Sequence, residues 1–244
     1  LASRQPVSFF TSVDVECFSR LAGEWEGVHD ACVREPRKGI DDMMKLYSSP
    51  ASPYVRKVRM TVGIKGLDGK IEYIPADTNK GDPELNKHNP LAKIPCLIGE
   101  DGAAIFDSQV ICEYLDSIGS GPVLFPRSGP ERWRTLTAGA LANGIIDAAL
   151  LLVYEKRFRP EGMHVQGWMD RQWAKINQSL DHLEKSPPQW QGSPDYAQVT
   201  LATALGYLDF RHSGSWRDTR PKLVAWLDAF AQAVPAYEPT KPVA

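Results

Sequence analysis

Three serines stand in the short run YSSPASPYVRKV, and each carries a hydroxyl that could donate a hydrogen bond to a reacting group. Ser52 directly precedes Pro53, a pairing typical of a helix start, with serine at the cap and proline in the first turn. Ser49 lies three residues earlier in the predicted turn, and Ser48 ends a predicted strand. Because a helix N-terminus also stabilises a nearby anion, capping a helix and activating an anionic nucleophile are compatible roles for one serine.

Two more features point to ligand binding. Pro95 in KIPCLI would remove a ladder hydrogen bond from a strand, so it belongs at a sheet edge, either trans or cis. A cis proline there would turn the backbone of Ile94 outward and offer its N–H and C=O to a peptide-like ligand. Asp107 and Ser108 follow a predicted strand and open a helix. They form either a simple cap or a site for a charged ligand, since helix N-termini favour carboxylates.

The composition does not favour a metal, a nucleic acid or a membrane as a partner. The four cysteines and five histidines are scattered, without metal-ligand spacing, and Cys96 and Cys112 lie in apolar runs typical of packing. The net charge of −2 gives no positive electrostatic field that would attract nucleic acid. The longest apolar stretch, residues 144–153, is too short to cross a bilayer, and we find no secretion signal. We therefore expect a soluble, cytoplasmic protein without a metal.

These residues fall in a segment of mixed strands and helices, which we place at residues 43–121. The expected order is strand, helix, strand, short helical passage, hairpin and helix: residues 43–48, 52–66, 70–77, 81–90, 93–106 and 108–119. A parallel βαβ unit followed by a hairpin and a helix is a compact α/β layer.

The helix expected after Ser52 has one apolar stripe, formed by Val55, Val58 and Val62. Its other faces carry the basic residues Arg56, Lys57, Arg59 and Lys65. Such clusters usually lie on a solvated face, and we expect a solvated face here rather than a binding patch.

The rest of the chain is expected to be helical. A Pro- and Gly-rich linker over residues 122–130 precedes an all-α domain over residues 131–244, whose helices cover 131–159, the region around 173–183, 195–210 and the region around 223–230. Residues 1–42 follow no sustained period, and we expect a disordered or non-native extension there.

The segment NPLAKIPCLIGEDGAAIFDSQVICEYLD resembles the glutathione-site signature of the glutathione S-transferase family. ALGYLDFR and RPKLVAWLDAFAQAVPAYEPTKP are similar to the helical domain of its bacterial members. The resemblance covers Met43 to the C-terminus. It implies a thioredoxin-like N-terminal domain, an all-helical C-terminal domain, and a homodimer that binds glutathione as co-substrate on the first domain.

The resemblance also implies residue roles. Pro95 would be cis, with the Ile94 backbone pairing with the cysteinyl part of glutathione. Asp107 would face the ammonium and Ser108 the carboxylate of the γ-glutamyl end, with Lys93 near the glycyl carboxylate. Glutathione carries two carboxylates and one ammonium, so groups of opposite charge would form charge-assisted hydrogen bonds with it.

Ser52-Pro53-Tyr54 is similar to the Ser-Pro-aromatic motif of serine-type members, in which the serine is catalytic. We therefore assign Ser52 as catalytic and keep Ser49 as its competitor at the glutathione site. The family often has a Ser-x-x-Asp capping box in its helical domain, where this chain has Asp195 and Gln198, a pair that can still form the box.

The implied function is a cytosolic transferase that activates the glutathione thiolate for attack on a small, largely apolar electrophile. Tyr154 and Phe158 either line the acceptor pocket or belong to the core. Two alternatives stay open at this point. One is peroxidase, dehalogenase or isomerase chemistry with glutathione on the same fold, and the other is a non-enzymatic interaction module.

Overall fold

Four strands pair into one mixed sheet in a computed structural model that describes residues 43–190 and 192–242. The extension predicted over residues 1–42 lies outside the described residues. The strands are β1 (Met44–Ser48), β2 (Ile71–Pro75), β3 (Cys96–Ile98) and β4 (Ala104–Ile105), in the sheet order β2-β1-β3-β4. β1 is parallel to β2 and antiparallel to β3, and β3 is antiparallel to β4, so the predicted βαβ unit and hairpin are both present.

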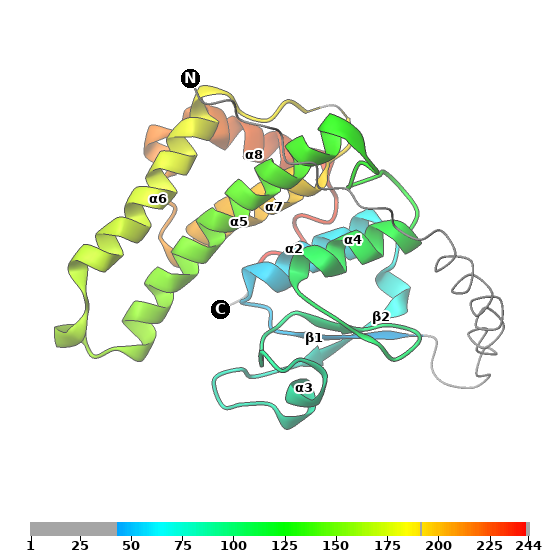
Figure 1. Cartoon of the computed structure of the whole chain (residues 1–244). Helices are drawn as coiled ribbons and strands as arrows, with labels where there is room; N and C mark the ends of the chain where they lie inside the picture. The colour runs from blue at the N-terminus through cyan, green and yellow to red at the C-terminus, as the bar shows by residue number, and fades with distance from the viewer. Residues whose placement is uncertain (1–42, 191, 243–244) are drawn as a thin grey trace, which may run out of the picture. The chain divides into compact units, whose positions relative to one another are not determined.

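Helices cover both faces of this sheet, as Figure 1 shows, with α2 (Pro53–Ile64) and α4 (Ser108–Ile118) on one face and α3 (Pro83–His88) on the other. Because side chains alternate along a strand, Leu46 faces α2 and α4, while Tyr47 packs with Leu85 of α3. The result is a three-layer, thioredoxin-like domain, as expected.

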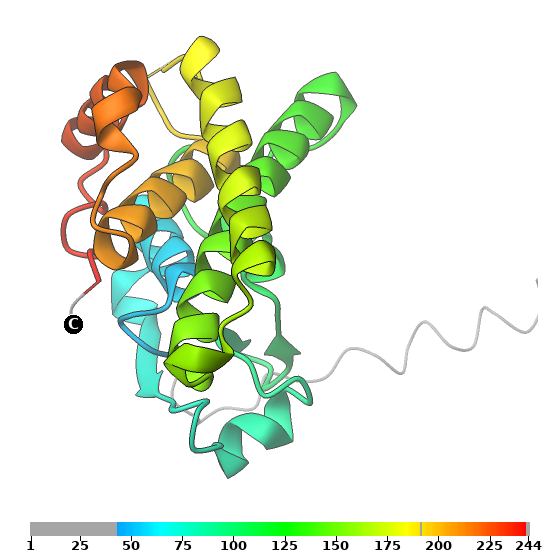
Figure 2. The same cartoon turned by 90° about the vertical axis from the view of Figure 1, so that its left-hand side faces the viewer.

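The remaining helices form the second domain: α5 (Gly129–Phe158), α6 (Gln166–Lys185), α7 (Tyr196–Arg211) and α8 (Pro221–Ala233). α5 and α6 run side by side in both views, and α7 packs against α5 (Figures 1 and 2). The all-helical second domain is thereby confirmed. The capping box also forms, since the Gln198 N–H donates to the Asp195 carboxylate at 2.8 Å and the Asp195 N–H donates to the Gln198 side chain at 3.1 Å.

α5 corrects one expectation from the sequence. Within the described part of the chain it is the one helix whose length and composition would allow it to cross a bilayer, so the apolar stretch is longer than residues 144–153 indicated. The core helix of a soluble protein can meet the same criteria; α5 packs against α6 and α7, and 39% of its apolar window is buried.

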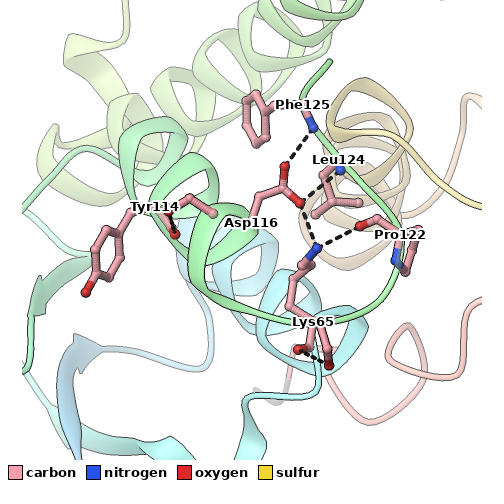
Figure 3. A network of polar contacts seen from close by, with 8 residues as sticks. Lys65, Tyr114, Asp116, Pro122, Leu124 and Phe125 are labelled. Atoms are coloured by element: carbon pink, nitrogen blue, oxygen red, sulfur yellow. Dashed lines mark hydrogen bonds and ion pairs between the residues drawn. The ribbon is translucent and has the colours of Figure 1, made fainter. Parts of the chain in front are cut away.

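A buried ion pair joins the end of α2 to α4, and its carboxylate also holds the segment that leads into α5. Lys65 Nζ lies 2.9 Å from the Asp116 carboxylate, and their side chains are 3% and 8% exposed. The same carboxylate accepts from the backbone N–H of Leu124 and of Phe125, each at 3.0 Å (Figure 3). The predicted linker is therefore held firmly against the first domain.

The expectation of a solvated basic face on α2 is wrong. Arg56, Lys57 and Lys65 are 3%, 0% and 2% exposed, and Arg59 is half-buried. The reason is that α2 contacts α4 on one side and α7 on another, which leaves little of its surface free. Arg56 fits because Gly206 of α7 has no side chain: a Cβ there would lie 2.2 Å from the Arg56 guanidinium.

Candidate functional site

The strand register brings three chain segments to one edge of the sheet, formed by the ends of β1 and β4 and the start of β3. Pro95 directly precedes β3, an inner strand, so the expected place on an edge strand is wrong, and no ladder hydrogen bond within β3 is lost. Tyr47 pairs with Cys96, so Pro95 lies beside the end of β1, where the chain turns toward Ser52. β4 is antiparallel to β3, with Ile105 opposite Leu97, so the chain leaves β4 at the same edge and reaches Asp107. The predicted site residues therefore converge from positions far apart in sequence.

Ser52 is the N-cap of α2, and its hydroxyl oxygen accepts from the Val55 N–H at 3.3 Å. A hydroxyl that accepts through its oxygen still has its proton to donate, so the cap does not prevent Ser52 from serving a ligand. Ser48 is 8% exposed, and its hydroxyl donates to the Ile74 carbonyl at 3.4 Å, which fits a structural role. Ser49 is half-buried in the turn, where its carbonyl accepts from the Ser52 N–H at 3.1 Å.

The Ile94–Pro95 peptide bond is cis, as the family resemblance implied. Asn89 shapes the loop that leads to it: this residue is 1% exposed, and its side chain donates to the Lys93 carbonyl at 2.8 Å and accepts from the Leu91 N–H at 3.0 Å. The Lys93 side chain is exposed and free to reach a ligand at this edge.

Asp107 is the N-cap of α4, and its carboxylate accepts from the Gln109 N–H at 3.0 Å. A carboxylate can accept several hydrogen bonds, so this cap leaves the exposed Asp107 with capacity for an ammonium. Ser108 follows at the first helical position and is 4% exposed. The first N–H groups of α4 and its dipole favour a carboxylate at this end.

The second domain reaches the same place through α5. The Tyr54 hydroxyl, two residues after Ser52, donates to the carboxylate of Asp147. Burial, and then the Asp147 carboxylate, raise the pKa of Tyr54, so it stays protonated at neutral pH. Leu151, Tyr154 and Phe158 follow Asp147 at helical spacing and are 39%, 37% and 58% exposed. They form an exposed apolar stripe, and Tyr154 and Phe158 meet edge to face with ring centroids 5.2 Å apart.

A small pocket borders Ser52 on the side of α7. It is lined by Ala51, Ser52, Pro53, Arg56, Tyr207 and Pro242. Arg56 brings a buried guanidinium to this pocket, and burial lowers the pKa of Arg56. Burial also raises the pKa of Tyr207 to about 12.

A larger cavity lies within the second domain, among Trp173, His212, Trp216 and Arg220. Its volume is about 50 Å³, well below the roughly 300 Å³ of a small ligand pocket. Arg220 there already binds Asp181 and Asn177, so this cavity is a packing feature rather than the site. Across the described residues, no group of three or more His, Cys, Asp or Glu side chains gathers in a metal-binding arrangement.

Sequence reasoning missed Asn89, Asp147 and Lys57. Asn89 carried a weak signal, because an Asn-Pro pair before a predicted strand indicates a turn. Asp147 is the one charge in the apolar run over residues 144–153, although nothing local connects it with Tyr54, 93 residues away. Lys57 was assigned to a solvated face, and its burial depends on helices that follow much later in the chain.

Comparisons with known proteins agree with this geometry. Residues 51–118 match the N-terminal domain of glutathione S-transferases, and residues 166–229 match their C-terminal domain. The chain is 37% identical over 185 residues to a GST-like protein of Escherichia coli described as uncharacterized, covering 74% of this chain and 90% of the relative. It is 31% identical over 218 residues to glutathione S-transferase L1 of Arabidopsis thaliana, covering 85% of each.

Solved structures give the same result. A glutathione transferase family member from Pseudomonas fluorescens with bound glutathione has a TM-score of 0.76 and 39% identity, covering 82% of this chain and all of that one. A glutathione S-transferase from Methylobacillus flagellatus with glutathione bound has a TM-score of 0.74 and 34% identity, with the same coverage. Both family domains match, and relatives more than 30% identical are covered over 85% or more of their length, so the chain belongs to the glutathione S-transferase family.

Proposed function

We propose that the chain is a serine-type glutathione transferase in which the Ser52 hydroxyl stabilises the glutathione thiolate. The observation that carries the proposal is the convergence of Ser52, Pro95 and Asp107 on one sheet edge. Two similar solved proteins hold glutathione, which supports it as the co-substrate here. Ser49 is the competing hydroxyl.

Each charged part of glutathione has a partner at this edge. The backbone of Ile94 pairs with the cysteinyl unit, and Lys93 approaches the glycyl carboxylate. Asp107 faces the γ-glutamyl ammonium, and the Ser108 end of α4 takes the γ-glutamyl carboxylate. These interactions exist before and during the reaction, so they contribute to binding more than to turnover.

In this proposal Ser52 helps to lower the pKa of the glutathione thiol. A free thiol has a pKa near 8.5, so bringing it below neutrality takes about two pKa units, or roughly 2.7 kcal/mol. A hydroxyl donor to an anion contributes about 1.5–3 kcal/mol, and the N-terminal end of α2 adds about 0.3–1 kcal/mol. Together these two contributions can supply the roughly 2.7 kcal/mol that lowers the thiol pKa by two units.

The acceptor is a small, largely apolar electrophile. The exposed stripe of Leu151, Tyr154 and Phe158 starts from Asp147, which contacts Tyr54 next to the α2 end, so apolar surface flanks the position of the sulfur. Conjugation of such compounds is a detoxification reaction.

We further propose that the protein acts as a homodimer in the cytoplasm. Val110 of α4 and Trp133 of α5 are 51% and 66% exposed on neighbouring helices, and a contiguous apolar patch around them would suit an association surface. The two described cysteines, Cys96 and Cys112, are buried free thiols, which suits a reducing compartment. Trp133→Glu should shift the mass measured by light scattering from dimer to monomer.

Retention on immobilised glutathione, followed by a panel of aromatic halides, epoxides and peroxides, tests the function. We expect retention and conjugation of the apolar halides. If the protein turns over only peroxides, the reaction is a peroxidase reaction and not a conjugation. If the protein is neither retained on glutathione nor active on any compound, it is a non-enzymatic interaction module.

A further inference from the structure

Lys57 is a fully buried ammonium at the meeting point of the two domains. It lies in the second turn of α2 and is 0% exposed. Its Nζ donates to the side-chain oxygen of Asn143 at 2.8 Å and to the Tyr196 hydroxyl at 3.1 Å. Both partners are uncharged, so this charge is solvated by dipoles rather than by an ion pair.

The contacts continue to the start of α4. The Tyr196 hydroxyl also accepts from the Asn143 side-chain amide at 3.1 Å and donates to the Gln109 side-chain oxygen at 3.4 Å. Gln109 is the residue after Ser108, and its N–H donates to the Asp107 carboxylate. Lys57 is thus connected, through Tyr196, to the first turn of α4. The Tyr196 ring reaches this position because Gly139 of α5 leaves room: a Cβ there would lie 2.5 Å from the ring.

A purely structural role does not explain this charge well. Burying an ammonium is costly, and a neutral side chain of similar volume is often at least as stable in such a place. A second buried lysine, Lys65 at the C-cap of α2, is offset directly by Asp116 at 2.9 Å. In the described part of the chain no carboxylate forms an ion pair with Lys57, so its direct partners are all neutral: the Asn143 side chain, the Tyr196 hydroxyl and the Tyr196 ring, whose centroid lies 5.2 Å from Nζ.

The electrostatics around Lys57 point toward the site. Burial lowers its pKa, and Cys112, Asp107 and Asp147 act in the opposite direction. Asp107 caps α4, and Asp147 holds Tyr54, so both carboxylates belong to the edge where glutathione is proposed to bind. A ligand carboxylate placed at the start of α4 would add the missing negative charge.

We propose that Lys57 is a positioning residue whose buried charge is balanced by the γ-glutamyl carboxylate of bound glutathione, with Tyr196 and Gln109 linking the two. The inference rests on the proposed function, because it requires glutathione at this edge. It differs from that function in assigning part of the carboxylate recognition to a residue that the ligand does not touch.

Calorimetric titration with two ligands tests the coupling. One ligand is glutathione, and the other is glutathione whose γ-glutamyl carboxyl is converted to an amide. In the wild type, we expect the amide to bind roughly 10- to 100-fold more weakly, as for loss of one charged hydrogen-bonding group. In Lys57→Met, glutathione binding weakens and the amide penalty shrinks by about 5-fold or more, the size of a typical coupling between sites.

Lys65→Met is the matched control, because it removes a similarly buried lysine at the C-cap of the same helix that is paired at the far end of α4. It should lower the unfolding midpoint and leave the wild-type amide penalty intact. Should Lys57→Met not fold, Lys57→Gln keeps an amide donor and removes only the charge. A folded Lys57 variant with the wild-type penalty would overturn the inference, as would a wild type that binds both ligands equally. A wild type that binds neither ligand would refute the proposed function instead.

Discussion

Replacing Asp116 should destabilise the protein far more than its distance from the site would indicate. Asp116→Ala leaves the Lys65 ammonium buried without its counter-ion and takes the acceptor away from the N–H groups of Leu124 and Phe125. Removing one partner of a buried pair costs about 3–5 kcal/mol. We expect a loss of about 4 kcal/mol, a large share of the roughly 5–15 kcal/mol that stabilises a typical protein.

Urea unfolding measures this loss. With a slope of about 2.5 kcal/mol per molar, the midpoint should fall by roughly 1.5 M. The double variant Asp116→Ala, Lys65→Met should recover part of the stability, because no buried charge is left alone. Glu72→Gln is the control: its pair with Lys45 is 3.9 Å long and half exposed, so we expect a change below about 1 kcal/mol. A loss under about 1 kcal/mol for Asp116→Ala would refute the reasoning.

Three further predictions concern the start of α4, the capping box of α7 and the buried His212. Asp107→Ala or Ser108→Ala should raise the KM for glutathione about 10-fold with a smaller fall in kcat, and an unchanged KM with poor turnover would exclude a binding role. Gln198→Ala opens the capping box of α7 and should cost about 1 kcal/mol in urea unfolding, whereas no change would show that Asp195 caps alone. Burial lowers the pKa of His212, so the unfolded chain binds this proton more readily and stability should fall as pH drops below 6.5. His212→Gln should flatten that part of the stability profile between about pH 7 and 5, and an equally steep profile would argue against it.

The order of elements could be predicted because local signals mark it. Ser52-Pro53 starts α2, the Glu-Asp-Gly turn separates β3 from β4, and Gly119 ends α4. Each of these depends on residues within one turn of the chain, where composition and backbone preference act directly. The convergence of Ser52 and Pro95 was implied only by the family resemblance, because local signals do not give the order of the strands in the sheet.

The burial of the basic residues could not be predicted. Hydrophobic periodicity identifies one apolar stripe on a helix, and on α2 that stripe faces the sheet. α7 then covers the face of α2 that carries Lys57, and the C-terminal segment covers the face that carries Arg56. The pair of Tyr54 and Asp147 was hidden for the same reason, since the packing of two domains creates it.

The most direct test of the account is the ultraviolet titration of glutathione thiolate bound to the wild type, Ser49→Ala and Ser52→Ala. If Ser52 stabilises the thiolate, Ser52→Ala raises the pKa of bound glutathione and slows conjugation by roughly 10- to 1,000-fold, with glutathione affinity nearly unchanged. Ser49→Ala should then titrate like the wild type. A shift confined to Ser49→Ala would make Ser52 only the cap of α2 and move the catalytic role three residues upstream, and no shift in either variant would contradict a serine mechanism.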